Sequence, residues 1–343
     1  MLHEKIEKCV RERTLEVLKR AEEYSNTVAD KASAFVNDYV TDKMGGTEDI
    51  CFAATGSVGR REALEASDLD LLPIARNDAA LEKWRPHDKD LRAALAGALK
   101  IKVSKGDDLT APCSLPGLTS PQKIGGDEDC SAELTKRVLL ITESVSVGGG
   151  MPIADVRTAL LDAYGNEDRT SGRHILSLCN DVARYYKTLC VEYIPRVMDP
   201  EKDWGTRNIK LRHSRKFWYF STIMSMVTIA DDHPKGDAAF KQALLEAFAK
   251  SPANRLADAI IGTHRLGLGR LLEAYGNFLE FMSCEDNRRA LAEVKHETRY
   301  TMTPGNPFLP MKLNSDLMHA EIMSIFEELG GSARSRIVGW FML

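Results

Sequence analysis

The stretch 53–74 constrains the fold more than any other part of the 343-residue chain. An apolar run leads into Gly56 and Ser57, and a second apolar run follows after a polar interval. Short apolar runs bounded by turn residues are typical of buried β-strands. We therefore expect two strands, over 50–55 and 69–75, joined by a glycine turn and a short helix over 58–64.

Gly56 and Ser57 stand where the first expected strand meets a helix. A glycine turn at a helix start leaves backbone N–H groups free beside the positive end of the helix dipole, and both favour phosphate binding. We expect Gly56 and Ser57 to contact phosphate groups through backbone N–H groups and the serine hydroxyl. Arg60 is expected either to add positive charge or to fix the turn by pairing with Glu62.

Asp68 and Asp70 lie two positions apart at the head of the second expected strand. Successive strand residues point to opposite faces, so the two carboxylates share a face. Paired carboxylates repel unless a cation lies between them, and oxygen ligands of this kind suit magnesium held together with substrate phosphates. The alternative is a surface pair at a strand entrance, but Asp70 falls inside the apolar run, where an unpaired charge is costly.

Three short motifs follow one another between residues 56 and 70: Gly-Ser, Gly-Arg-x-Glu and Ser-Asp-x-Asp. In this order and spacing they resemble nucleotidyltransferases of the DNA polymerase β superfamily, most closely the branch of PII-protein uridylyltransferases and their uncharacterised relatives. The resemblance covers residues 50–147. It implies transfer of a nucleoside monophosphate from a nucleoside triphosphate to an acceptor hydroxyl, with Asp68 and Asp70 as catalytic residues and ligands of two Mg²⁺ ions. It favours a protein as the acceptor, with a small molecule as the alternative.

A third carboxylate usually completes the site in this superfamily, on the next strand, which we expect over 101–104. This sequence has Lys102 there. Asp108, just beyond the end of that strand, is the candidate for a third catalytic carboxylate. Alternatively the third ligand is missing, and the chain senses a nucleotide without transferring it.

The basic and aromatic segment 204–219 is the second candidate for function. If it is α-helical, Lys210 and Ser214 share one face, while Arg215 and Lys216 lie on a neighbouring face. In the resembled superfamily a helical domain supplies Lys, Arg or Ser groups to the triphosphate. By that resemblance we expect these four residues to bind the triphosphate and Tyr185 or Tyr186 to stack on the base. The alternative is a solvated basic face whose aromatic residues are core.

A different enzyme class has a signature in the same segment. Arg207 and Asn208, followed after four residues by His213, match the Arg-Asn-x4-His pattern of HEPN-type ribonucleases. In that interpretation Arg207 holds the scissile phosphate and His213 acts as general acid or base, since its unperturbed pKa is near neutral.

Composition sets outer limits on the partners. The formal net charge is −4, which argues against long nucleic acid as a partner. No apolar run approaches the roughly 18 residues of a membrane helix, so no membrane partner is expected. The seven cysteines lack a Cys-x-x-Cys spacing and predict neither a disulfide framework nor a zinc site, which suits the cytoplasm.

The remaining sequence is mostly of helical periodicity. We expect one or two helices over 3–43, a helix over 78–99 that is interrupted near Pro86, and a helix over 132–145. A long loop is expected over 106–129, and helices throughout the chain after residue 150. The predicted fold class is α+β. Its expected parts are an N-terminal helical segment over 1–46, a nucleotidyltransferase core with a small mixed sheet over 47–150, and an all-helical domain over 151–343.

Overall fold

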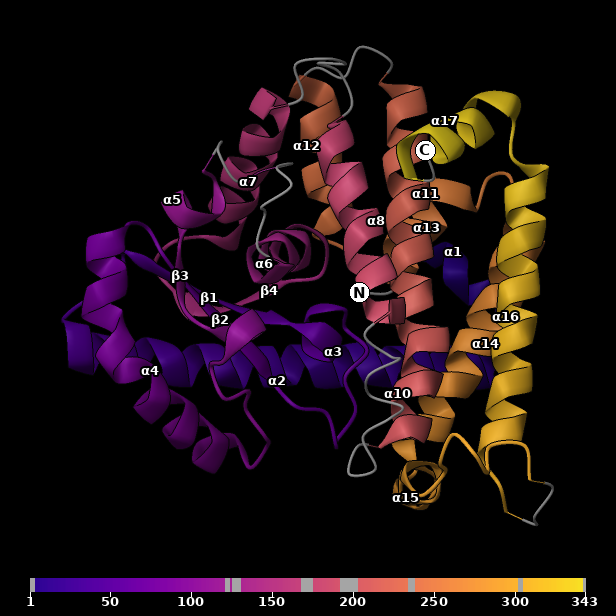
Figure 1. Ribbon diagram of the computed structural model, residues 1–343, viewed down its shortest axis with the longest axis horizontal. Helices are drawn as coiled ribbons and strands as arrows, with labels where there is room; N and C mark the ends of the chain where they lie inside the picture. Colours follow the sequence, from indigo (N-terminus) through magenta and orange to yellow (C-terminus); the bar gives the residue numbers. More distant parts are fainter. Residues whose placement is uncertain are drawn as a thin grey trace. The chain divides into compact units, whose positions relative to one another are not determined.

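The computed structural model of the chain describes residues 4–120, 124, 131–167, 175–191, 203–233, 238–301 and 305–341 (Figure 1). Helices dominate these residues, and the strands among them form one small mixed sheet, which confirms the predicted α+β class. None of the helices in this part of the chain combines the length and the apolar character that a membrane span requires.

The chain folds as two compact units, each assembled from separate stretches of sequence. The sheet unit comprises Glu22–Asp181 and Asp232–Ser251. The helical unit comprises Met1–Ala21, Val182–Asp231 and Pro252–Leu343. Each unit therefore depends on contacts between residues that are far apart in the chain.

Helix α2 has residues in both units, so the division predicted at residue 46 does not coincide with a unit boundary. The division predicted at residue 150 lies inside the sheet unit, which continues to Asp181. After the short helix α1 (Glu4–Glu7), α2 runs without a break over Glu12–Met44. Its first ten residues belong to the helical unit and the rest to the sheet unit. The N-terminal helical segment is therefore shared by both units.

The sheet has the strand order β3-β2-β1-β4, and its strands are β1 (Ile50–Thr55), β2 (Asp70–Ala75), β3 (Cys113–Ser114) and β4 (Val145–Gly149). Strand β1 pairs antiparallel with both β2 and β4, whereas β3 pairs parallel with β2. The strands predicted over 50–55 and 69–75 are confirmed within one residue.

Helices cover both faces of the sheet (Figure 1). On one face, α2 and α4 (Asp78–Leu99) pack on alternate residues of the strands, and the ring of Trp84 meets that of Phe52 edge to face at 4.9 Å. On the other face, β1 contacts α6 (Ser131–Thr142) and α7 (Ile153–Glu167). Burial on both sides accounts for the nearly unbroken apolar runs of β1 and β2.

Three local predictions need correction. The helix expected over 132–145 ends at Thr142, because the chain then enters β4, where a side chain at Gly149 would collide with the carbonyl oxygen of Ile50. The expected loop over 106–129 contains the short helices η1 (Asp108–Thr110) and α5 (Leu115–Leu118) and strand β3, while residues 121–123 and 125–130 lie outside the description. Helix α4 continues through Pro86.

The helical unit contains most of the remaining helices. One continuous helix spans residues 204–232, and we call it the basic helix; it comprises α10 (Trp204–Lys210), the π-helical turn η2 (Leu211–Arg215) and α11 (Lys216–Asp232). The others are α13 (Pro252–Ile260), α14 (Arg265–Ser283), α15 (Glu285–Ala292), α16 (Phe308–Glu328) and α17 (Gly331–Phe341). Helix α8 (Leu176–Val191) has residues in both units, and α12 (Ala238–Phe248) belongs to the sheet unit.

Candidate functional site

The candidate site begins at the turn after β1. Gly56 has a φ of +66°, a backbone conformation that favours glycine. Residues Gly56–Gly59 form a single helical turn, α3, and Arg61 then takes a φ of +57°. The helix predicted over 58–64 is therefore wrong, and a helix of one turn has little dipole. Phosphate binding here would depend on the free N–H groups of the turn and on the Ser57 hydroxyl.

Asp70 lies directly beside this turn. It is paired across the sheet with Thr55, the residue that precedes Gly56. A Cβ atom added to Gly56 would lie 2.3 Å from Oδ2 of Asp70, so the carboxylate occupies the space that a side chain at residue 56 would need. The structure thus brings the glycine turn and one of the two predicted acids into contact distance.

Asp68 shares a sheet face with Asp70. Leu69 and Leu71 are buried in the core formed with α2 and α4. Because strand side chains alternate, Asp68 and Asp70 point to the other face. Asp68 is exposed and Asp70 is half-buried. We call residues 56–70 the acidic turn.

Local hydrogen bonds hold the loop that carries Asp68. The backbone N–H of Leu64 donates to Oγ of Ser67 at 2.9 Å, and the N–H of Ser67 donates back to the Leu64 carbonyl at 2.7 Å. The N–H of Ala63 donates to Oγ of Ser25 on α2 at 2.9 Å. The Ser67 contacts are of the kind its turn position predicts, whereas Ser25 has no sequence signal because its role depends on packing.

Arg60 is engaged inside the protein. Its guanidinium contacts Glu62 at 2.6 Å and Glu143, at the end of α6, also at 2.6 Å, and all three side chains are buried. Burial lowers the pKa of Arg60, but the two carboxylates outweigh it and raise that pKa above its ordinary value. Of the two roles expected for Arg60, these contacts fit the fixing of the turn and leave no guanidinium face for a nucleotide. Sequence reasoning found Glu62 but missed Glu143, which is 83 residues away.

Residue 102, where the resemblance predicts a third carboxylate, is a lysine. The strand predicted over 101–104 is reduced to a single parallel bridge between Val103 and Leu69. Lys102 is exposed, and Asp108 begins η1, although its side chain lies outside the description. Among the described residues, no group of three or more His, Cys, Asp or Glu side chains is arranged to hold a metal ion. Of the acids predicted to bind a metal, the structure describes the side chains of Asp68 and Asp70.

No protein-family model and no curated protein matches the chain. The resemblance to the nucleotidyltransferases therefore depends on the motifs and on the geometry of the acidic turn.

The basic residues expected at the triphosphate lie in the helical unit, whereas the acidic turn lies in the sheet unit. Lys210 is exposed, Arg215 and Lys216 are half-buried, and Ser214 is buried. Burial, reinforced by the neighbouring Arg212, lowers the pKa of Lys216. The relative positions of the two units are not determined, so a joint triphosphate site stays a prediction.

The π-helical turn changes the faces of the basic helix. The expected faces assumed 3.6 residues per turn, but Leu211–Arg215 is π-helical. An inserted residue rotates everything that follows it relative to an ideal α-helix. Lys210 and Ser214, four residues apart, stay near one side of the helix, but Lys210 is exposed whereas Ser214 is buried. No composition or spacing signal marks such a turn in the sequence.

His213 is part of the core of the helical unit. Its exposed fraction is 0%, Nδ1 lies 2.9 Å from the Ile209 carbonyl, and Nε2 lies 3.0 Å from Nδ2 of Asn314. Its ring stacks on Phe278 at 4.7 Å. Burial lowers the pKa of His213 to about 4. An imidazole with both nitrogens engaged and no access to solvent does not fit the acid or base of a ribonuclease, although Arg207 is exposed.

The two tyrosines proposed for the base are also engaged. Tyr185 is buried and meets the ring of Trp218 edge to face at 5.4 Å. Tyr186 stacks on Tyr219 at 4.1 Å, with the rings nearly parallel. Each ring already contacts another aromatic ring. To stack on a base, the buried Tyr185 would have to change its position, and Tyr186 could offer only the ring face that is turned away from Tyr219.

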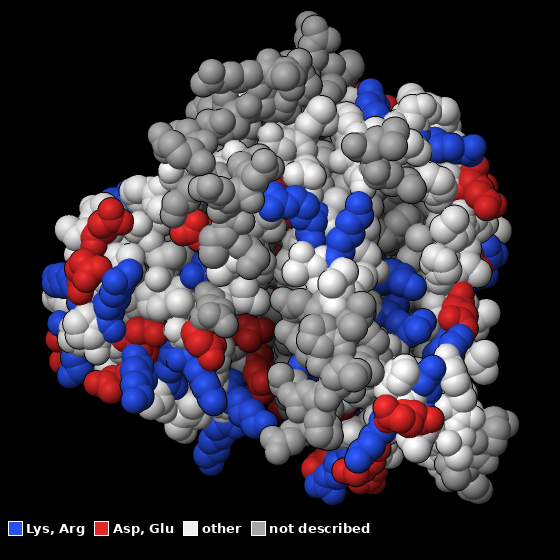
Figure 2. Space-filling model, viewed as in Figure 1, with Lys and Arg blue, Asp and Glu red and all other residues white. Residues whose placement is uncertain are grey.

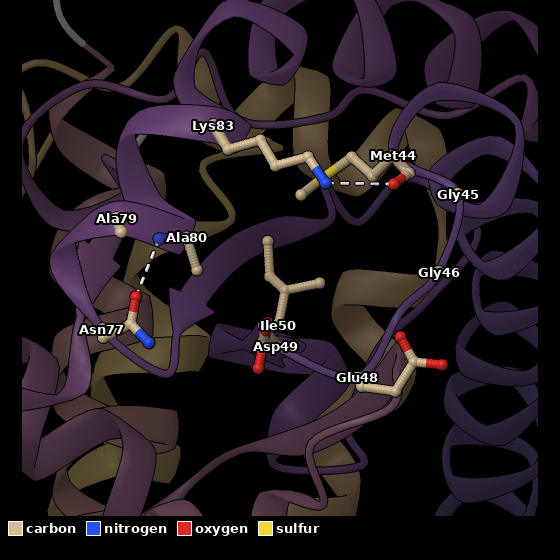
Figure 3. A pocket seen from close by; sticks show the side chains of 10 residues that line it. All are labelled: Met44, Gly45, Gly46, Glu48, Asp49, Ile50, Asn77, Ala79, Ala80 and Lys83. Atoms are coloured by element: carbon tan, nitrogen blue, oxygen red, sulfur yellow. Dashed lines mark hydrogen bonds between the residues drawn. The ribbon is translucent and has the colours of Figure 1, made fainter.

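A separate recess of about 360 Å³ lies at the opposite end of β1 from Gly56 (Figure 3). Glu48, Asp49 and Ile50 are among the residues that line it. Lys83 also lines the recess, and its Nζ donates a hydrogen bond to the Met44 carbonyl at 3.1 Å. This recess contains none of the residues predicted for phosphate or metal binding.

Charge on the visible face of the molecule is mixed. In Figure 2, Lys and Arg side chains alternate with Asp and Glu side chains over the described surface. This pattern agrees with the net charge of −4 and offers no extended field of one sign to attract a polyanion on this face.

Proposed function

We propose that the protein is a magnesium-dependent nucleotidyltransferase, which moves a nucleoside monophosphate from a nucleoside triphosphate to an acceptor hydroxyl. The single observation that carries the proposal is the contact between Asp70 and the glycine turn, where the space above Gly56 is filled by Oδ2 of Asp70. A phosphate on the N–H groups of this turn would therefore lie beside a carboxylate, and such a pair attracts a divalent cation.

The donor set fits magnesium. Mg²⁺ is commonly bound by one or two carboxylates together with substrate phosphates, and Asp68 and Asp70 supply two carboxylates on one face of the sheet. Both residues would hold the ion, with water and phosphate oxygens completing its shell. When bound, magnesium supplies positive charge to the phosphate oxygens.

The residues of the acidic turn have separate tasks in this proposal. The N–H groups after Gly56 and the hydroxyl of Ser57 bind the β- and γ-phosphates, while Arg60 keeps the turn in place through Glu62 and Glu143. The acceptor oxygen forms a bond to the α-phosphorus, the bond to the bridging oxygen breaks, pyrophosphate leaves, and the hydroxyl proton passes to solvent. Positioning and charge neutralisation account for most of such catalysis.

The motif resemblance favours a protein hydroxyl as acceptor, with a small molecule as the alternative. The scattered cysteines favour a cytoplasmic location. The motif resemblance also predicts triphosphate contacts at Lys210, Ser214, Arg215 and Lys216, a prediction tested below through Lys210. Each of these assignments is tested separately from the Asp68 and Asp70 pair.

The direct test measures magnesium-dependent release of pyrophosphate from each of the four nucleoside triphosphates in the presence of cell lysate. Asp68→Asn combined with Asp70→Asn removes both carboxylate charges and should abolish release. Asp30→Asn is the matched control, because Asp30 is an exposed acid on α2. Release that is unchanged in the double variant would refute the proposal. Saturable nucleotide binding without release in the unaltered protein would indicate a nucleotide sensor instead.

A further inference from the structure

Helix α16 carries an uncharged stripe on its outer face, and we call these five residues the outer stripe: Pro310, Leu313, Leu317, Ala320 and Ser324. They follow one another at alternating spacings of three and four residues, the spacing of a helix–helix seam. Leu313 is 64% exposed and Leu317 is 65% exposed. The outer face of a surface helix normally carries charged and polar residues, so this stripe is a candidate contact surface.

The outer stripe points away from the core of the helical unit. Met311, Met318 and Ile325, on the opposite side of α16, are buried. On that side the helix contacts α14 and the basic helix (Figure 1). The core therefore already has its own set of α16 residues, and the stripe is additional apolar surface.

A further exposed leucine borders one end of the stripe. Leu266, at the start of α14, is 78% exposed. The next residue, Gly267, lies against α16, because a Cβ atom added to it would lie 2.9 Å from Cγ1 of Ile325. Ile325 directly follows Ser324, so the apolar surface continues from the Ser324 end of the stripe onto α14.

The charged side chains beside the stripe are paired within the unit. Nζ of Lys312 lies 2.5 Å from Oδ2 of Asp316, and Nε of Arg270 lies 2.7 Å from Oε1 of Glu321. Each pair has no net charge, so the edges of the stripe do not select a strongly charged partner. A partner with the same balance of charge and the same apolar stripe fits better, and a second copy of this chain has both.

The stripe complements itself when two copies of α16 pack antiparallel about a two-fold axis. With the axis between Leu317 and Ala320, Leu317 of one copy faces Ala320 of the other. In the same register Leu313 faces Ser324 of the other copy. Each large residue then meets a small one, which lets the two helix surfaces interdigitate.

Charge favours this register over the neighbouring one. If the axis passed near Ser315 instead, Leu313 would face Leu317, but Asp316 of one copy would lie closest to Asp316 of the other. Like charges in contact oppose association. In the first register Asp316 lies closest to Met323 of the other copy, and no like charges meet.

We propose that the outer stripe is a dimer interface, at which two copies of the chain pack α16 against α16 in antiparallel orientation. The stripe covers about 21 Å of helix, so the interface is small and the dimer should form reversibly and depend on concentration. This inference is independent of the proposed function.

The test measures the molar mass of the full-length chain by sedimentation velocity over a range of concentrations. We expect the mass of the unaltered protein to rise from that of a monomer towards that of a dimer. Leu317→Asp should raise the dissociation constant at least about tenfold, because a carboxylate replaces the central apolar contact. Val191→Asp is the matched control, since Val191 is 62% exposed on α8, outside the stripe, and it should leave the dissociation constant unchanged.

Ala320→Leu separates a matched interface from general hydrophobic association. This change enlarges the exposed apolar surface, so unspecific association would become stronger. In the proposed register the new side chain collides with Leu317 of the other copy, and we expect a weaker dimer. Leu317→Ala combined with Ala320→Leu exchanges the large and the small residue and should restore dimer formation. Circular dichroism should show the same helix content in all variants, because the changed positions are exposed.

Three results would overturn the inference. The first is an unaltered chain that stays monomeric at every concentration, whether or not it binds another protein. The second is an Ala320→Leu variant that dimerises as tightly as the unaltered protein. The third is a double variant that dimerises no better than Ala320→Leu alone.

Discussion

The acidic turn and the basic helix were both predicted from sequence to bind the same triphosphate, yet their structures differ in kind. In the acidic turn, Gly56 has a positive φ, and Asp70 pairs across the sheet with the preceding residue, Thr55. The carboxylate of Asp70 therefore lies against Gly56. In the basic helix, a π-helical turn rotates the side chains and the core takes His213 and Ser214. The position of Asp70 beside Gly56 therefore depends on local strand pairing, whereas the burial of His213 and Ser214 depends on how the helical unit packs.

The comparison also separates two uses of positive charge. Arg60 in the acidic turn is buried between two carboxylates, whereas Lys210 on the basic helix is exposed. A buried pair stabilises a conformation, while an exposed cation adds little to stability and is accessible to a ligand. Four substitutions or conditions test this contrast.

The largest effect is expected from Arg60→Met. Removing the guanidinium leaves Glu62 and Glu143 buried without their partner, and breaking a buried ion pair costs about 3–5 kcal/mol of unfolding free energy. Urea denaturation measures the loss. Arg76→Met is the control, because its pair with Asp49 is half exposed and should change stability by less than about 1 kcal/mol. Equal losses in the two variants would contradict the structural role of Arg60.

The next effect is a pH dependence in the basic helix. The pKa of His213 is lowered to about 4 in the folded protein by burial, against about 6.5 when unfolded. Between these two pKa values the unfolded state binds more protons than the folded state. His213 therefore has no effect on the unfolding free energy above pH 6.5. As the pH falls from 6.5 towards 4, His213 lowers the unfolding free energy by about 3 kcal/mol in total. Unfolding measured at pH 7 and pH 4.5 should show a smaller difference in His213→Gln. An unchanged difference would place His213 in contact with solvent.

Gly56→Ala should have an intermediate effect on stability and a large one on binding. The alanine Cβ atom would collide with Oδ2 of Asp70. The positive φ of residue 56 would also cost an alanine about 1–3 kcal/mol of unfolding free energy. We expect lower stability and loss of nucleotide binding by isothermal titration calorimetry. Gly97→Ala is the control, since a Cβ there meets nothing within 4 Å inside α4, and alanine should stabilise that helix by about 0.5–1 kcal/mol.

The smallest effect sharpens the comparison most. Lys210→Met should leave the unfolding free energy within about 0.5 kcal/mol, because Lys210 is exposed. If the basic helix contacts the triphosphate, nucleotide affinity should fall about tenfold, which corresponds to about 1.4 kcal/mol. Lys295→Met, an exposed lysine elsewhere in the helical unit, provides the baseline. Identical affinities in the two variants would restrict the site to the acidic turn.

The sequence predicted the elements that local chemistry determines. Strands β1 and β2, the turn at Gly56 and the pairing of Arg60 with Glu62 follow from apolar runs, turn residues and short spacing. Strand β4 was missed because Gly148 and Gly149 resemble a helix end, and only pairing with β1 makes them part of a sheet. Glu143 was missed because its role depends on a fold that joins residues 83 positions apart.

The division of the chain into interleaved units bears on how it folds during translation. The sheet unit has all its segments once Ser251 has left the ribosome. The other unit cannot close at that point, because Thr14 near the start of α2 awaits Glu273, which accepts its hydroxyl at 2.8 Å. The first ten residues of α2 thus find their partners in the helical unit only after residue 273 has been synthesised.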